Sequence, residues 1–194
     1  MKPETITRYW LEEVGPSGWY TATPELDADI RARFAPAWTA VQSGAFADWG
    51  ASADGALAGL ILTDQFPRNM FREDARSFAT DALAVRLAEA ALVAGHDLAI
   101  TVPARQFFYL PFMHAEVGAL QTRGIALFAA RMPGSNLRHA RAHAAVIARF
   151  GRCPWRNAVL GRVSSDAETA FLAQGGYRSA LREIPAIEPE NQIV

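Results

Sequence analysis

The sequence predicts an all-α, single-domain array of about seven to nine antiparallel helices. Apolar residues recur at steps of three or four in several segments, and proline, glycine or capping residues bound these segments. Strand patterns are nearly absent, because the one apolar run of that type, residues 98–102, has no partner run of comparable quality. The length of 194 residues also favours one domain over two.

Two helices are predicted near the N-terminus. The first covers about Glu4–Val14. The second begins after Thr23, a capping residue that is followed by proline at the first helical position, and it ends at Gly44. Its apolar face consists of Leu26, Ile30, Phe34, Trp38 and Val41.

Two more helices are predicted before residue 95. One covers about Asp54–Phe66 and ends there, because Pro67 disfavours α geometry at the residue before it. The next covers about Thr80–Ala94, with Gly95 just beyond its end. One face of this second helix consists of Leu83, Leu87 and Ala91.

The predicted helices of the C-terminal half also begin and end at prolines, glycines or capping residues. We place the domain at residues 1–183 and expect residues 184–194 to form an extended tail with two prolines. The helices are a short one from Val102-Pro103 toward Leu110, one from Pro111 to Met132-Pro133-Gly134, one from Ser135 or Asn136 to Gly151, and one opened by the capping box Ser165–Glu168.

Composition excludes several classes of protein. A net charge of −1 and a pI near 6.4 give no overall basic field, so we expect no nucleic-acid partner. One cysteine excludes an intrachain disulfide and a zinc site built on several cysteines. The N-terminus has no apolar run typical of a secretory signal, and the uncharged run 55–63 is too short to span a membrane. We therefore expect a cytoplasmic protein without a membrane partner or a cofactor.

In two segments near the end of a predicted helix, Phe66–Asn69 and Cys153–Asn157, a proline is followed by Arg-Asn, with Trp155 intervening in the second; we call both Pro-Arg-Asn segments. Arg72 follows the first segment and Arg162 the second. Guanidinium groups recognise carboxylate or phosphate, so the segments would form an anion site if they converge. Alternatively, each arginine binds carbonyl groups at a helix end or pairs with Asp64, Asp81 or Glu116. The candidate ligand-binding residues are Asp64, Gln65, Arg68, Asn69, Arg72, Arg156 and Asn157.

His114 and Glu116 are the candidate catalytic residues. His114 would act as acid or base, with Glu116 or Asp64 as its orienting carboxylate. On a regular helix, residues two apart point about 200° from each other, so the pair requires a distorted turn. The alternative for His114 is a buried hydrogen-bonding role.

Two further features suggest chemistry but favour a structural role. His139 and His143 have the i, i+4 spacing of metal ligands on a helix. Two ligands are fewer than a catalytic zinc site needs, and the neighbouring arginines repel a cation, so no metal is expected. Cys153 is expected to be an inert thiol, because it lies at the negative end of a predicted helix dipole.

Five motifs of the sequence are Leu62–Asn69, Arg76–Asp81, Phe108–Glu116, Arg149–Asn157 and Leu160–Arg162. Together they resemble the bacterial family catalogued as domain of unknown function 924, and the likeness covers about residues 10–175. The resemblance implies a fold similar to tetratricopeptide-like helical stacks and brings no established activity. The chain departs from the family pattern where Met-His-Ala-Glu stands in place of Glu-His-Ser-Glu, and where Trp155 replaces a usual histidine, Cys153 a usual phenylalanine and Glu73-Asp74 a usual Gly-Thr.

Three functions fit these observations. The leading hypothesis is a binding protein whose Arg/Asn-rich groove accepts a small anionic metabolite or an acidic peptide. The second is a protein–protein interaction or oligomerisation module, and the third is an enzyme that uses His114. Trp10, Trp19 and Trp49 lie near predicted helix ends, where burial is the expectation for most of them and surface anchoring of a homo-oligomer is the alternative.

Overall fold

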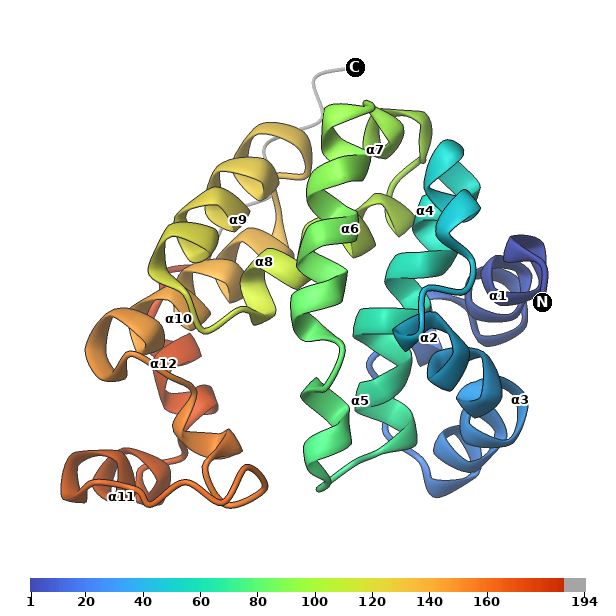
Figure 1. The fold of residues 1–194 in the computed structure, drawn as a ribbon. Coiled ribbons are helices and arrows are strands. Elements are labelled where there is room, and N and C mark those ends of the chain that lie inside the picture. The colour runs from blue at the N-terminus through green and yellow to red at the C-terminus, as the bar shows by residue number, and fades with distance from the viewer. Residues whose placement is uncertain (187–194) are drawn as a thin grey trace. The chain divides into compact units, whose positions relative to one another are not determined.

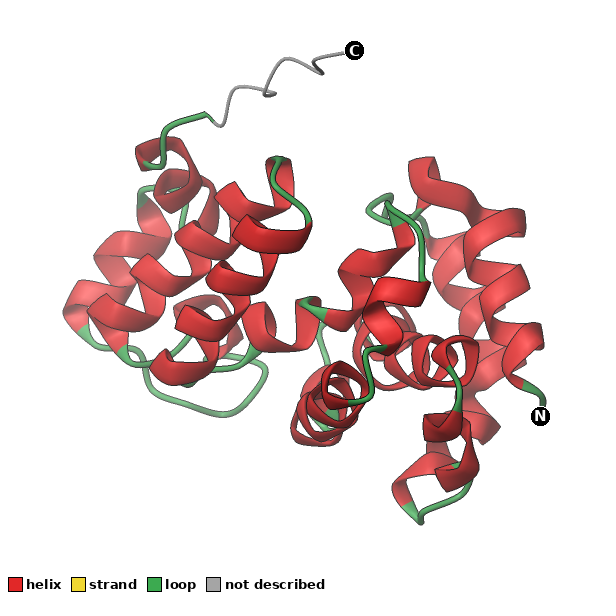
Figure 2. Cartoon of the chain, turned by 90° about the horizontal axis from the view of Figure 1, so that it is seen from above, coloured by secondary structure: helices red, strands yellow, loops and turns green. Residues whose placement is uncertain are grey.

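The computed structural model describes residues 1–186, and its regular elements are helices without a strand among these residues (Figures 1 and 2). The all-α prediction is therefore confirmed. The chain divides into two compact units, Met1–Pro111 and Phe112–Val194, which we call the N-terminal and C-terminal units and describe separately. The single domain 1–183 and the likeness to tetratricopeptide-like stacks stay predictions. Most of the expected tail 184–194 lies outside the described residues.

The helices of the N-terminal unit follow one another with short connections (Figure 1). Two of its turns, η1 and η3, are π-helical, and η2, η4 and η5 are 3₁₀ turns. In chain order the elements are α1 (Pro3–Arg8), η1 (Tyr9–Val14), α2 (Gly15–Gly18), α3 (Pro24–Gln42), η2 (Ala47–Ala51), α4 (Ala53–Leu60), η3 (Ile61–Gln65), α5 (Phe66–Met70), η4 (Ala75–Phe78), α6 (Asp81–Val93), α7 (His96–Ala99) and η5 (Ala104–Phe108).

Buried aromatic rings form much of the core of this unit. Phe34 of α3 packs on Phe66 of α5, with ring centroids 4.7 Å apart, and Trp10 of η1 packs edge-on against Phe66 at 5.4 Å. Edge contacts of this kind add to the free energy of burying the rings. Trp10, Trp19 and Trp49 are at most 7% exposed, so their burial is confirmed and none of them is a surface anchor.

The predicted helix end at Phe66 is wrong. The helical path continues past Pro67 to Met70. The chain passes from α4 through the π turn η3 into α5, whose first turn contains Pro67. Proline is tolerated in a first turn, where its missing N–H group costs little. The carbonyl group of Thr63, four residues before Pro67, instead accepts a hydrogen bond of 2.6 Å from the hydroxyl group of Thr80. That hydroxyl also accepts from the indole nitrogen of Trp38 at 3.1 Å.

Helix α6 buries a different face from the one expected. Its buried residues are Ala84, Ala88 and Ala91, whereas Leu83 and Leu87 are only partly buried. The small alanine side chains face the interior of the unit, and α6 packs against α4. Gly95 follows α6 with a φ of +73°, a left-handed conformation that glycine adopts without strain.

The C-terminal unit begins within α8 (Leu110–His114), the helix that contains the boundary between the units. The expected helix from Pro111 to Met132 is wrong, because residues 115–117 interrupt it between α8 and α9. The N-cap of α10 is Gly134 rather than Ser135 or Asn136. The remaining elements are α9 (Gly118–Arg131), α10 (Ser135–Phe150), η6 (Pro154–Arg156), α11 (Asp166–Ala173) and α12 (Tyr177–Glu183).

Two details of this unit bear on its function. The capping box at Ser165 and Glu168 is confirmed, with both of its hydrogen bonds present. Helix α12, which follows the pair Gly175-Gly176, was not expected. It packs against α10. A small core of Val146, Phe171 and Ala180, flanked by Phe150 and Trp155, joins α10, α11 and α12.

None of the helices within residues 1–186 combines the length and the apolar character needed to cross a membrane.

Replacing Thr80 by valine tests the account of the π turn. The variant removes the hydroxyl group that serves both Thr63 and Trp38, so the free energy of unfolding should fall by about 1–3 kcal/mol. Thr39→Val is the matched control, because Thr39 is exposed and binds only a carbonyl group of its own helix; it should change stability by less than about 0.5 kcal/mol. Chemical denaturation of the two variants measures both values, and equal losses would contradict the account.

Candidate functional site

The first Pro-Arg-Asn segment is held by carboxylates of its own unit. Arg68 of α5 pairs with Asp64 at 3.1 Å and with Asp81 of α6 at 2.9 Å. Asp64 is only 3% exposed, so this pair is shielded from water and from salt. The contacts of Arg68 therefore agree with the alternative in which arginine pairs with Asp64 and Asp81.

Asp27 of α3 is the partner of the other two polar residues in this segment. Its carboxylate accepts two hydrogen bonds from Arg72, of 2.6 and 2.9 Å, and a third of 3.0 Å from the amide group of Asn69. The amide group of Gln65 donates to the side-chain oxygen of Asn69 at 3.0 Å. This network ties α3 to α5, and the sequence reasoning missed Asp27, which lies 45 residues before Arg72.

The network changes the titration of Asp27. Burial favours the neutral acid and would raise its pKa, but the hydrogen bonds from Arg72 and Asn69 outweigh burial and lower the pKa below 3.8. The same bonds raise the pKa of Arg72. The carboxylate is therefore ionised at neutral pH and contributes to stability in that form.

The second segment is held in a similar way within the C-terminal unit. Arg162 forms a bidentate pair with Glu116, with hydrogen bonds of 2.6 and 3.0 Å. The main-chain N–H group of Cys153 donates to the same carboxylate at 2.8 Å. Glu116 lies in the loop between α8 and α9, so these bonds fix that loop to the chain around η6. They lower the pKa of Glu116, although burial alone would raise it.

The remaining predicted residues of this segment are buried. Arg156 is 5% exposed and donates through Nη2 to the main-chain oxygen of His114 at 2.9 Å. The amide group of Asn157 donates to the hydroxyl group of Ser164 at 3.0 Å. The two Pro-Arg-Asn segments belong to different units, so their convergence into one groove stays a prediction.

The pairing of His114 with Glu116 also stays a prediction. The Glu116 carboxylate accepts hydrogen bonds from Arg162 and from the main chain of Cys153, and the centroids of the His114 and His143 rings are 6.1 Å apart. Because Glu116 lies outside a helix, the 200° separation expected on a regular helix does not apply to this pair.

Cys153 is buried, and burial raises the pKa of its thiol to about 12. A thiol with this pKa is almost entirely protonated at neutral pH, so it is a poor nucleophile. This agrees with the expectation of an inert thiol.

Four rings of the C-terminal unit form a cluster that the sequence reasoning did not assemble. His139 Nδ1 and the phenol oxygen of Tyr177 share a hydrogen bond of 2.5 Å. The ring of His143 lies 4.8 Å from Tyr177 and 5.7 Å from Trp155. We call His139, His143, Trp155 and Tyr177 the imidazole–phenol cluster; each is partly exposed, and His114 touches its edge.

The cluster continues the core-facing side of α10. His139 and His143 lie seven and three residues before Val146, a spacing that places all three on one helix face. Val146 is 2% exposed and belongs to the core, whereas the two histidines occupy the partly exposed end of the same face. Polar rings thus stand where apolar residues would pack more favourably, which is typical of functional positions.

The electrostatic surroundings of the cluster are positive. Burial is the main cause that lowers the pKa of His139, and the charge of Arg138 lowers it further. Burial also raises the pKa of Tyr177 to about 12, against the effect of Arg138. Arg138 itself donates to the carbonyl oxygens of Leu181 and Ile184, at 2.8 and 2.9 Å, so it binds the C-terminal end of α12 without losing its charge to a carboxylate there.

A charge bias in the sequence could have pointed to this region. Residues 117–165 contain eight arginines and neither Asp nor Glu. The C-terminal unit has ten arginines against six acidic residues, a net charge of +4, and the N-terminal unit has nine basic against 14 acidic residues, a net charge of −5. The net charge of −1 for the whole chain conceals this difference.

The described part of the chain contains no group of three His, Cys, Asp or Glu side chains arranged to hold a metal ion. His139 and His143 remain two imidazoles beside Arg138, and this charge disfavours a bound cation.

Comparisons with known proteins agree with the fold. The family described as "Bacterial protein of unknown function (DUF924)" matches residues 6–176. The solved structure of ATU0120, a protein of unknown function from Agrobacterium tumefaciens, is similar to this chain with a TM-score of 0.86 and 38% sequence identity. The similarity covers 89% of this chain and 97% of that one. No match was found among curated proteins.

Replacing Asp27 by asparagine tests the network around α3 and α5. The variant should lower the free energy of unfolding by about 1–2 kcal/mol at neutral pH, because Arg72 loses its ionic partner and is itself half exposed. The folded pKa of Asp27 lies below 3.8, so the stabilisation is present above that pH and is lost as the pH falls below it. The two proteins should therefore converge in acid.

Asp48→Asn is the control, because Asp48 is exposed and has no hydrogen-bond or ion-pair partner among the described residues; its effect should stay below about 0.5 kcal/mol. Urea denaturation at several pH values measures all three proteins. A constant difference between wild type and Asp27→Asn down to low pH would contradict the assignment.

Replacing His139 by glutamine tests the cluster through its pH dependence. The folded pKa of His139 is lower than its ordinary value of 6.5, so the unfolded chain takes up the proton first as the pH falls. Wild type should lose stability relative to the variant as the pH falls below 6.5, with no such trend above it. Thermal denaturation at a series of pH values measures the difference, and a rise of relative stability in acid would contradict it.

Proposed function

The chain belongs to the bacterial DUF924 family of proteins of unknown function, and we propose that it binds a small anionic ligand at the imidazole–phenol cluster. The observation that supports the proposal is the placement of this partly exposed cluster on the basic helices of the C-terminal unit. Helices α9, α10 and α12 together carry seven arginines and one glutamate. An anion placed among these helices gains favourable electrostatic energy, whereas a cation is repelled.

The contacts favour this cluster over the first Pro-Arg-Asn segment as the place of binding. Arg68 and Arg72 already hold carboxylates at 2.6–3.1 Å, and a ligand would have to displace Asp27, Asp64 or Asp81. Displacing a hydrogen-bonded carboxylate costs about as much as the new bond returns. Arg138, by contrast, donates to neutral carbonyl groups.

Histidine couples the proposed binding to pH. Neutral His139 can take up a proton when an anion approaches, because the anion offsets the effects of burial and of Arg138 that lower its pKa. Binding should therefore be tighter at about pH 6 than at about pH 8. Arg156 and His114, both among the predicted site residues, adjoin the cluster through the His114 carbonyl group and the contact between His114 and His143.

A second function, a protein–protein interaction or oligomerisation module, is supported by the internal pairing of the predicted arginines. Arg68, Arg72 and Arg162 each bind a carboxylate of their own unit, as expected of residues that only fasten helices. A third function, an enzyme with His114 as acid or base, has the weakest support, because Glu116 is held by Arg162. For each function we propose a cytoplasmic location.

Inorganic pyrophosphate is a suitable probe of anion binding. At about a hundredfold excess over its dissociation constant, a ligand of the folded chain adds about 2.7 kcal/mol of stability, which is several degrees in Tm. We expect stabilisation of wild type that is larger at about pH 6 than at about pH 8. Isothermal titration should give an affinity at least about tenfold weaker for His139→Gln and Tyr177→Phe.

Arg72→Gln and Arg86→Gln are the controls. The first removes a predicted site residue, and the second removes the same charge from the exposed face of α6. Both should keep the affinity of wild type, although Arg72→Gln should be less stable. Loss of affinity in Arg72→Gln with none in His139→Gln would move the site to the first segment. No stabilisation by pyrophosphate at either pH would contradict anion binding at the cluster.

A further inference from the structure

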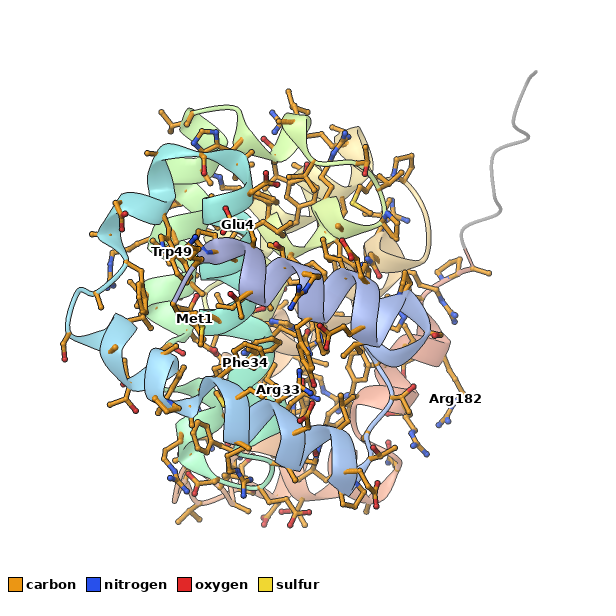
Figure 3. All side chains as sticks on the ribbon, turned by 90° about the vertical axis from the view of Figure 1, so that its right-hand side faces the viewer. Met1, Glu4, Arg33, Phe34, Trp49 and Arg182 are labelled. Atoms are coloured by element: carbon orange, nitrogen blue, oxygen red, sulfur yellow. The ribbon has the colours of Figure 1, made fainter. Side chains whose placement is uncertain are left out.

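Exposed arginines on α10 and α12 form a basic surface. Arg141, Arg178 and Arg182 are exposed, and none of them has a carboxylate partner among residues 1–186. Figure 3 shows the side chain of Arg182 extending away from α12. We call these three residues the basic patch. Arg178 and Arg182 are four residues apart on α12, and like charges at this spacing repel one another, so an acidic partner would reduce this repulsion.

The N-terminal unit has a hollow that is lined by three acidic residues. A hollow of about 470 Å³ beside α1 and the start of α4 is lined by Glu4, Glu12 and Asp54, which we call the acidic patch. Each of the three is exposed and has no ion-pair partner in the described part of the chain. Of the two basic residues that line the same hollow, Arg8 is paired with Glu13. Glu4 lies on the side of α1 that Figure 3 presents.

We propose that the chain self-associates head to tail, with the basic patch of one copy docking on the acidic patch of another. The net charges of the two units, +4 and −5, are opposite in sign and similar in size, so a contact between unlike units of two copies is electrostatically attractive. This proposal does not require an anion at the cluster, because His139 and Tyr177 are outside both patches, but Arg141, Arg178 and Arg182 also belong to the seven arginines that favour an anion there.

The geometry of such a contact determines the species that form. A head-to-tail contact leaves one patch free at each end, so copies add until a ring closes or the chain continues. The contact is made by exposed charges, so salt should weaken it strongly. Self-association should therefore increase with protein concentration at low ionic strength and disappear at high ionic strength.

Sedimentation velocity on the full chain tests the proposal. At about 20 mM salt the average mass should rise with concentration above the 21.1 kDa of one chain, and at about 500 mM it should return to that value. Two charge-reversal variants separate the patches. One carries Arg141→Glu, Arg178→Glu and Arg182→Glu, and the other carries Glu4→Arg, Glu12→Arg and Asp54→Arg.

Each variant alone has two patches of the same sign and should stay monomeric at low salt. Mixed together they have complementary patches, so the mixture should regain association. Arg86→Glu reverses a charge on the exposed face of α6, outside both patches; it is the control for charge reversal elsewhere on the chain and should associate like wild type. Circular dichroism checks that each variant is folded.

Three outcomes would overturn the proposal. These are a wild-type chain that stays monomeric at low salt, association that persists in either variant alone, and a mixture that stays monomeric. If His139→Gln loses pyrophosphate binding but self-associates normally, the anion site and the docking surfaces are distinct.

Discussion

Ion pairs between arginine and carboxylate side chains that are far apart in the sequence hold the polar residues of both units in place. Asp27 joins α3 to α5 through Arg72 and Asn69, and Glu116 joins the loop after α8 to the chain around η6 through Arg162. Arginine suits this role because its planar fork gives two parallel hydrogen bonds to one carboxylate. In α5 these pairs add to the packing of Phe66 in the aromatic core.

The same pairs decide where binding chemistry is available. A guanidinium group that already holds a buried carboxylate is part of the framework, and this applies to Arg68 and Arg72 in the N-terminal unit. The imidazole–phenol cluster is different, because its neighbour Arg138 binds neutral carbonyl groups and keeps the local potential positive. The proposed anion site and the proposed basic patch both follow from this uneven distribution of charge.

Features governed by neighbouring residues could be predicted from the sequence. The capping box at Ser165 and the cap at Thr23 involve contacts within four residues, and both are present. The π turn η3 could not be predicted from local sequence. The carbonyl group of Thr63 in this turn accepts a hydrogen bond from Thr80, which lies 17 residues away at the N-cap of α6. Helix α12 was missed because Gly175-Gly176 was taken only as the end of a helix, although Tyr177, Ala180 and Leu181 follow at helical spacing.

The contacts of the candidate site residues could be predicted only where the partner was already under consideration. Asp64 and Asp81 were named as possible partners of arginine, but the partner of Arg72 lies 45 residues away and no local pattern indicates it. The acid-free run 117–165 was present in the sequence, and an average over the whole chain concealed it. A separate charge count for each part of the chain would have drawn attention to the helices that carry the imidazole–phenol cluster.

The central claim is that the arginines of the Pro-Arg-Asn segments belong to the framework and that the imidazole–phenol cluster receives the anion. Nitrogen NMR of arginine Nε–H and histidine ring signals, recorded during a titration with pyrophosphate, observes both groups of residues in one sample. The account predicts that the ring signals of His139 and His143 shift while the Nε–H signals of Arg72 and Arg162 stay in place. Shifts at Arg72 and Arg162 with unchanged histidine signals would contradict it.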